Sequence, residues 1–321
     1  NLVASQVVAL ADKQYKAFSI ENTDSLPPRN VYAAYYLLDA AGQSDLHQAL
    51  KLCSKPGSYP EVMFKRRSAS VFMQGLAFCC IAALCCLALW MGTADGISPL
   101  AWPFVVLLLL WPASEIGISA LYWMIEQLRQ PSRLLRYDYS KGVPAQASTM
   151  VVIPVIWSHY TDIKGTAERL ELHYLANRDS HIHYAILSDF RDADMEQLPE
   201  DERVLSTAQA EIERLAVTYP GSTFHLFHRR RTWNPSEQVW MGWERKRGKL
   251  EEFVKLLKEG KRTSYCSIVG DESVLSTIRY VITLDADTRL PLESAHRMIG
   301  AMDLPYNRPR LNQAGTRVVE G

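Results

Sequence analysis

Residues 280–288 read YVITLDADT, an apolar run that stops at two carboxylates, Asp285 and Asp287, separated by one residue. A short apolar run bounded in this way is typical of a buried strand. Mg²⁺ and Mn²⁺ prefer one or two carboxylates together with the phosphates of a bound ligand. The stretch therefore favours a divalent-cation site that holds a nucleotide diphosphate. The alternative is that the two acids only begin a turn or cap the next helix, as many short Asp-x-Asp matches do.

Similar apolar runs recur upstream and alternate with helical patterns. Strands are expected at 149–154, 184–187, 224–227 and 280–284, and helices at 162–175, 204–219 and 250–257. Alternating strands and helices indicate an α/β fold with a mainly parallel sheet. Ligands bind such sheets at the carboxyl ends of the strands. Asp189 and Asp285 both follow strands at that edge, so we expect them to share one site.

Two basic clusters lie between these acids, at 227–235 (FHRRRTWNP) and 243–249 (WERKRGK). Their cations, including Arg245 and Arg247, suit neutralisation of a diphosphate leaving group. Gly248 would let the backbone pass close to a ligand, and Lys249 would reach a phosphate or the base. For the run 229–231 a second interpretation stays open, namely a solvated basic face or contact with anionic lipid.

Composition excludes some classes of protein. The chain has 35 basic and 35 acidic residues, so it lacks the basic field of nucleic-acid-binding proteins. Its predicted strands also lack an aromatic platform for stacked bases, and no nucleic-acid partner is expected. Four of the 6 cysteines share one apolar run (79, 80, 85 and 86), and no Cys-x-x-Cys pair occurs. We therefore expect neither a disulfide framework nor a structural zinc site.

Two long apolar runs, 71–91 and 99–125, predict a transmembrane helical hairpin. Lys and Arg flank the pair on both sides and are absent from 92–98, which predicts that both ends lie in the cytoplasm. The alternative is a buried helical hairpin in a soluble core. Glu115 in the second run would face a polar path or lie near the interface.

The sequence thus suggests three regions. Residues 1–64 form a cytoplasmic helical juxtamembrane region without assigned chemistry, 65–130 carry the hairpin, and 131–321 form the N-terminal part of an α/β domain. The chain begins without a methionine and ends at Gly321 without a stop signal, so we expect it to be a fragment of a larger polypeptide.

Four stretches carry a family resemblance: VVIP at 151–154, LHYLAN at 172–177, WMGWERKRGKL at 240–250 and the stretch at 280–288. Together they resemble glycosyltransferases of the GT-A fold (nucleotide-diphospho-sugar transferases), and more specifically the cyclic β-1,2-glucan synthase family. The resemblance implies a UDP-glucose donor, Mg²⁺ or Mn²⁺, and an inverting hexosyl transfer that extends a β-1,2-linked glucan acceptor. It also implies a multi-pass protein of the bacterial inner membrane, with the lipid bilayer as a partner and the transferase domain in the cytoplasm.

The resemblance also assigns roles to single residues. Asp287 would bind the metal, Asp285 the metal or the ribose, Asp189 the uracil or the ribose, and Lys249 would approach the nucleotide. The general base expected of an inverting enzyme would lie beyond Gly321. No catalytic residue is therefore assignable, and the fragment is expected to be inactive alone. Other interpretations are a non-catalytic, membrane-anchored nucleotide-binding module, a transferase with a lipid or protein acceptor, and a structural membrane protein.

Overall fold

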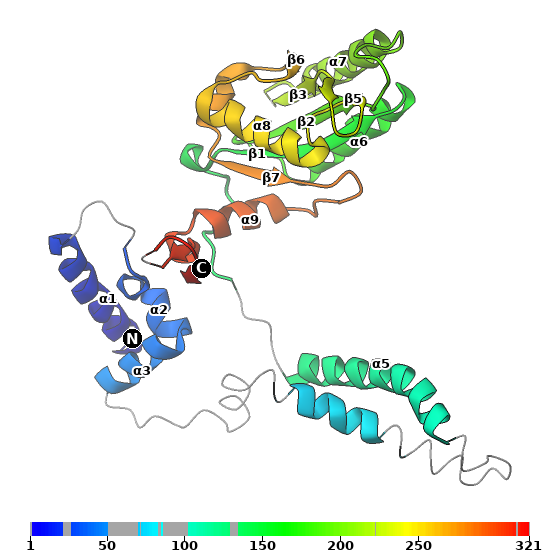
Figure 1. Ribbon diagram of the computed structural model, residues 1–321. Helices are drawn as coiled ribbons and strands as arrows, with labels where there is room; N and C mark the ends of the chain where they lie inside the picture. Colours follow the sequence, from blue (N-terminus) through cyan, green and yellow to red (C-terminus); the bar gives the residue numbers. More distant parts are fainter. Residues whose placement is uncertain are drawn as a thin grey trace. The chain divides into compact units, whose positions relative to one another are not determined.

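The computed structural model describes residues 2–21, 27–50, 70, 72–82, 85, 102–128, 134–221, 223–312 and 314–320. The chain divides into two compact units, Asn1–Arg133 and Leu134–Gly321. Figure 1 shows the second unit as a sheet flanked by helices and the first as helices alone. Each unit has its own packing, so each is described by itself.

Where the structure describes the first unit, it contains a small helical cluster, a long helix and a further helical segment at 72–82. Its helices are α1 (Leu2–Glu21), α2 (Ala33–Leu38), α3 (Ala40–Ala49) and α5 (Trp102–Leu128), with a 3-10 turn at Arg29–Val31. Val7, Ala11, Tyr36 and Leu46 form the core of the cluster of α1, α2 and α3. The described residues before residue 51 are therefore mainly helical.

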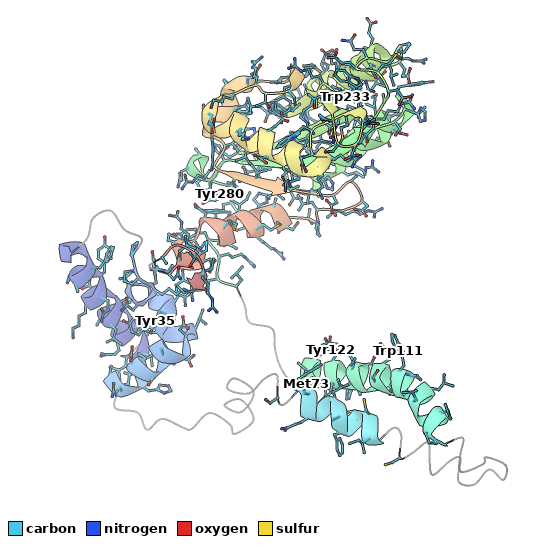
Figure 2. All side chains as sticks on the ribbon, in the orientation of Figure 1. Tyr35, Met73, Trp111, Tyr122, Trp233 and Tyr280 are labelled. Carbon is cyan, nitrogen blue, oxygen red and sulfur yellow. The ribbon has the colours of Figure 1, made fainter. Side chains whose placement is uncertain are left out.

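Helical residues 72–82 pack against α5. The ring of Phe72 lies 6.1 Å from that of Tyr122, which Figure 2 labels. A Cβ on Gly117 would lie 3.2 Å from the Cβ of Cys79, so a small residue lets the two helical segments approach closely. Within the part of the chain that the structure describes, no helix is both long and apolar enough to cross a membrane. The predicted transmembrane hairpin is therefore not supported; residues 86–98, which include the end of its first span, lie outside the described residues.

The second unit is built on a five-stranded sheet of order β6-β3-β2-β1-β7. The strands are β1 (Thr149–Trp157), β2 (Ile182–Phe190), β3 (Phe224–Arg229), β6 (Tyr265–Val269) and β7 (Tyr280–Thr283). β7, β1, β2 and β3 run parallel, and β6 pairs antiparallel with β3. The expected α/β fold with a mainly parallel sheet is confirmed, and the arrangement fits a GT-A-like fold.

Helices cover both faces of this sheet (Figure 1). The bounds are α6 (Thr161–Ala176), α7 (Asp201–Thr218), α8 (Arg245–Glu259) and α9 (Ser294–Asp303). Val151 and Ile153 of β1 belong to the core that α6, α7 and α9 share, whereas Met150 and Val152 belong to the core against α8. Successive residues of β1 thus face opposite helical layers, which explains its unbroken apolar run.

Smaller elements complete the second unit. They are two hairpins, β4 (Thr232–Asn234) with β5 (Val239–Met241) and β8 (Arg310–Leu311) with β9 (Val318–Glu320), and 3-10 turns at Ala145–Ala147, Glu272–Thr277 and Pro305–Asn307. The sequence patterns did not indicate β4, β5 or β6. β4 and β5 have three residues each, too few for an alternating pattern to appear.

Candidate functional site

A buried ion network lies where β2 and β3 end. The carboxylate of Asp189 accepts hydrogen bonds from Arg229 at both oxygens, with Nε–Oδ1 at 2.8 Å and Nη2–Oδ2 at 2.9 Å. The Nζ of Lys249, on α8, lies 3.1 Å from Oδ2. The side chains of Asp189, Arg229 and Lys249 are each at most 2% exposed. A planar guanidinium on a carboxylate makes two parallel hydrogen bonds, which is the strongest arrangement for such a pair.

Arg229 is also held from the side of α8. Its Nη1 lies 2.8 Å from Oε1 of Glu252, and its guanidinium donates to the backbone carbonyls of Trp243 (3.2 Å) and Arg245 (3.1 Å). Oε2 of Glu252 accepts from the backbone N–H of Ser264 (3.1 Å) and from its hydroxyl (2.6 Å). Two cations therefore face two carboxylates, with further polar contacts around them. Buried charges persist in proteins when they are paired in this way.

The network shifts the pKa values of its members. Burial lowers the pKa of Lys249 to about 8, against the opposing charge of Asp189. For Glu252, burial acts to raise the pKa, but hydrogen bonds from Ser264 and Thr263 and the charge of Arg229 outweigh it, so the pKa is lowered. Glu252 is therefore an anion at neutral pH, as its place beside Arg229 requires.

Asp189 and Lys249 were expected to contact the donor nucleotide, and the structure places both inside the protein. Each oxygen of Asp189 is engaged by Arg229 or Lys249, and Lys249 also donates to the carbonyl of Val155. Their role in donor binding stays a prediction. Their observed contacts give them a structural role, because they tie α8 to the ends of β1, β2 and β3.

The basic run 229–231 is not a continuous solvated face, and that interpretation is wrong for two of its three arginines. Arg229 is fully buried, and Arg231 is 2% exposed. Arg231 pairs with Asp201, with Nη2–Oδ1 at 3.1 Å, and its Nε donates to the carbonyl of Arg191 at 2.7 Å. Arg230 is exposed. The two buried arginines are those whose guanidinium groups pair with buried carboxylates, Arg229 with Asp189 and Arg231 with Asp201.

The acid pair lies in a turn directly after β7. Asp285 is exposed and forms an ion pair with Lys246, in the first turn of α8. Asp287 is also exposed and lines a cavity of about 460 Å³ together with Arg169, His173 and Arg289. The contact between Lys246 and Asp285 brings the basic first turn of α8 beside the acids that follow β7. Lys246 belongs to the basic cluster seen in the sequence but was not predicted as a site residue.

Arg245 and Arg247, the other expected donor-binding residues, also lie in this first turn. Arg245 forms ion pairs with Asp192 (2.9 Å) and Glu237 (2.7 Å). Arg247 is 75% exposed at its side chain, and its Nε lies 3.7 Å from a carboxylate oxygen of Glu244. Arg247 and Lys246 each have one carboxylate partner, and their side chains are 75% and 54% exposed, so both can reach an anionic ligand. Arg245 is already paired twice.

The residues fit a divalent cation that is shared with a ligand. Among the described residues, no group of three or more His, Cys, Asp or Glu side chains is placed to hold a metal ion. Two exposed carboxylates, Asp285 and Asp287, are the protein ligands that Mg²⁺ needs when phosphate oxygens and water complete its shell. The donor set therefore suits a cation that arrives with a diphosphate and does not suit a cation caged by protein alone.

From the sequence, Gly248 was expected to let the backbone pass close to a ligand. In the structure its neighbour is the side chain and carbonyl of Trp243. A Cβ at this position would lie 2.1 Å from the carbonyl oxygen of Trp243 and 2.7 Å from its ring. The absence of a side chain therefore makes room for Trp243 against α8.

Gly248→Ala is expected to destabilise the second unit by about 1–3 kcal/mol, because the added methyl group overpacks this contact. Gly165, on α6, is the matched control, because a Cβ there meets nothing within 4 Å. Gly165→Ala should stabilise by about 0.5–1 kcal/mol, the usual gain for an unhindered helix interior. Urea unfolding of both variants measures this difference. A neutral or stabilising Gly248→Ala would contradict the packing argument.

Comparison with known proteins identifies a clear relative. In an alignment of 233 residues that covers 70% of this chain, the sequence is 39% identical to cyclic beta-(1,2)-glucan synthase NdvB of Rhizobium meliloti (strain 1021). The matched segment spans 8% of that protein. A scan against protein-family models finds no match.

Proposed function

Because this chain belongs to the cyclic β-(1,2)-glucan synthase family, we propose that residues 134–321 bind the sugar nucleotide in a glycosyltransferase. The donor would be UDP-glucose, the cation Mg²⁺ or Mn²⁺, and the product a β-1,2-linked glucan. One observation carries the proposal, namely the ion pair between Lys246 and Asp285. It brings the basic first turn of α8 next to the two carboxylates at the carboxyl edge of the sheet. In open α/β sheets ligands bind at that edge.

The chemistry assigns a task to each group. Asp285 and Asp287 would hold the cation, which neutralises charge on the diphosphate leaving group. Lys246 and Arg247 would contact the same phosphates, because both extend from the first turn of α8. Positive groups around a leaving diphosphate stabilise the charge that develops as the sugar–phosphate bond breaks.

The buried network of Asp189, Arg229, Lys249 and Glu252 would hold the first turn of α8 in position. Arg229 donates to the carbonyls of Trp243 and Arg245, which begin α8. Rigid support of this kind keeps binding groups in position without touching the ligand. We assign none of the described residues as the general base of an inverting transfer. Attachment to the bilayer through 71–91 and 99–125, and a cytoplasmic location at the bacterial inner membrane, remain predictions from the sequence.

The proposal predicts metal-dependent binding of UDP. Calorimetric titration of the chain with UDP should show binding with Mg²⁺ or Mn²⁺ and much weaker binding with a chelator. Asp287→Asn should weaken binding about tenfold or more, because it removes one of the two carboxylates that hold the cation.

Glu213→Gln provides the matched control, since it makes the same carboxylate-to-amide change at an exposed position of α7. It should bind UDP like the unaltered chain. Equal affinity for UDP in the presence of metal and of chelator would refute the metal site.

A further inference from the structure

Two exposed tryptophans line one small cavity beside the β4–β5 hairpin. Trp233 is 47% exposed and Trp243 is 41% exposed. Figure 2 labels Trp233 on the second unit. The cavity measures about 290 Å³, and its wall also contains Asn234, Glu237 and Arg245. An exposed indole ring lacks the stabilisation that burial of its apolar surface would give. Two such rings around one cavity therefore indicate a ligand-binding site.

The two indole rings are held in place by separate contacts. The ring of Trp233 lies 5.8 Å from that of Trp240, its partner on β5. The carbonyl of Trp243 accepts a hydrogen bond from buried Arg229, and its ring packs where Gly248 leaves space. The cavity is therefore preformed, which lowers the entropic cost of binding.

Backbone strain concentrates around the same cavity. Among the described residues, four non-glycine residues have positive φ, and three of them are Gln238 (52°), Glu244 (50°) and Arg245 (44°). Glu244 and Arg245 line the cavity, and Gln238 lies in the turn between β4 and β5. Such conformations are energetically unfavourable for residues with a side chain and cluster at ligand clamps. The surrounding structure therefore holds these residues in backbone conformations that they would not adopt by preference.

The polar groups in the wall suit a neutral, polyhydroxylated ligand. Glu237 accepts from Arg245 at 2.7 Å, and Arg245 also bonds Asp192 at 2.9 Å. The amide of Asn234 lies 3.5 Å from Glu237. The positive charge of Arg245 is thus already balanced by carboxylates, so the cavity does not select for an anion. Fixed donors and acceptors beside an aromatic face are what a sugar ring requires, because its C–H face packs on the indole while its hydroxyls form hydrogen bonds.

We propose that this cavity is a saccharide subsite that holds a β-linked glucose unit of the glucan. Its volume of about 290 Å³ lies just below the about 300–1,000 Å³ typical of ligand pockets, which suits a ligand as small as one or two sugar units. The identification of the ligand as glucan rests on the proposed function. The cavity, its two exposed tryptophans and its paired charges are observed independently of that function. Arg245 is shared between this cavity and the first turn of α8, so the subsite adjoins the proposed donor site.

The test is calorimetric titration of the full chain with the β-1,2-linked glucose disaccharide. The unaltered chain should bind it saturably, and Trp233→Ala should weaken binding about tenfold, equivalent to about 1.4 kcal/mol. Trp233→Phe should retain most of the affinity, because it keeps an aromatic face. Trp111→Ala is the matched control: Trp111 is 77% exposed on α5, and its loss should leave disaccharide binding unchanged.

A parallel titration with UDP and Mg²⁺ separates the two proposals. Trp233→Ala should leave UDP affinity unchanged. If UDP affinity fell together with disaccharide affinity, the cavity would be a nucleobase site and the saccharide assignment would be wrong. Absence of disaccharide binding to the unaltered chain, or equal binding by Trp233→Ala, would also overturn it. Disaccharide binding without metal-dependent UDP binding would support the subsite while refuting the donor site.

Discussion

Arg229→Ala is expected to lower the free energy of unfolding of the second unit by about 3–5 kcal/mol, the usual cost of breaking a buried ion pair from one side. The guanidinium is fully buried and bonds Asp189 and Glu252 at the same time. Its removal leaves Asp189 with Lys249 alone and takes the cation away from Glu252. It also removes the donor to the carbonyls of Trp243 and Arg245.

Arg230→Ala is the matched control, because Arg230 is the adjacent residue of the same type and is exposed. A surface change of this kind should stay within about 0.5 kcal/mol of the unaltered protein. Urea unfolding of both variants at pH 7 gives the comparison. If the two variants were equally stable, the buried network would contribute nothing to the fold.

Acidification from pH 7 to pH 5 is expected to cost the fold about 3–4 kcal/mol through two buried histidines. Burial lowers the pKa of His225 to about 4 and that of His228 to about 3. Neighbouring His183 lowers the pKa of His225 further, and Asp271 partly offsets it; Lys249 acts in the same sense as burial on His228. In the unfolded chain both histidines have a pKa of about 6.5.

Both histidines have a lower pKa in the folded protein than in the unfolded chain, so acid destabilises the folded state. Below pH 6.5 the two imidazoles bind protons in the unfolded chain but stay neutral in the folded protein. The free energy of unfolding therefore decreases as pH falls. The loss is largely complete for each group only when pH reaches its folded pKa. Carboxylates begin to titrate near pH 4.5, so the window from pH 6.5 to pH 5 isolates the histidines.

Urea unfolding at pH 7, 6 and 5 tests this expectation, with NMR titration of the two imidazoles as the direct readout. The ring nitrogens of His225 have no hydrogen-bond partner among the described residues, and neither does Nε2 of His228. Nδ1 of His228 lies 2.7 Å from the neutral hydroxyl of Ser188. Burial outweighs the charges of Asp271 and Asp201, which favour the charged form of His225 and His228 respectively. Unchanged stability between pH 7 and pH 5, or an imidazole that titrates near pH 6.5 in the folded protein, would contradict the argument.

Parts of the fold could be predicted because their signal is local. The apolar runs at 149–154, 184–187 and 224–227 correspond to β1, β2 and β3, and the run at 280–284 to β7. The predicted helix at 250–257 begins at Arg245 instead, because its first turn, RKRGK, carries no apolar periodicity. β6 was missed because its residues, YCSIV, make neither a continuous apolar run nor a clean alternation.

The candidate site likewise has a part that could be predicted from local sequence and a part that could not. Asp285 and Asp287 lie exposed after β7. The strand before them was expected to be buried, but β7 lies at the edge of the sheet and only its Ile282 is buried. The burial of Arg229, Arg231 and Lys249 has no local signal, since each looks like one more cation in a basic run. Their partners lie far away in the chain: Asp189 is 40 residues from Arg229, and Asp201 is 30 residues from Arg231.

By itself, the sequence determined the mainly parallel α/β sheet, the order of its four parallel strands along the chain and the position of the acid pair at the sheet edge. These follow from hydrophobic runs and from the geometry of parallel strands, which each segment carries in its own residues. Only the tertiary structure decided which basic side chains are buried in ion pairs, which remain open to a ligand, and that Trp233 and Trp243 face one cavity. Those outcomes depend on contacts between distant segments, because a charge can be buried only where folding brings its partner within hydrogen-bonding distance.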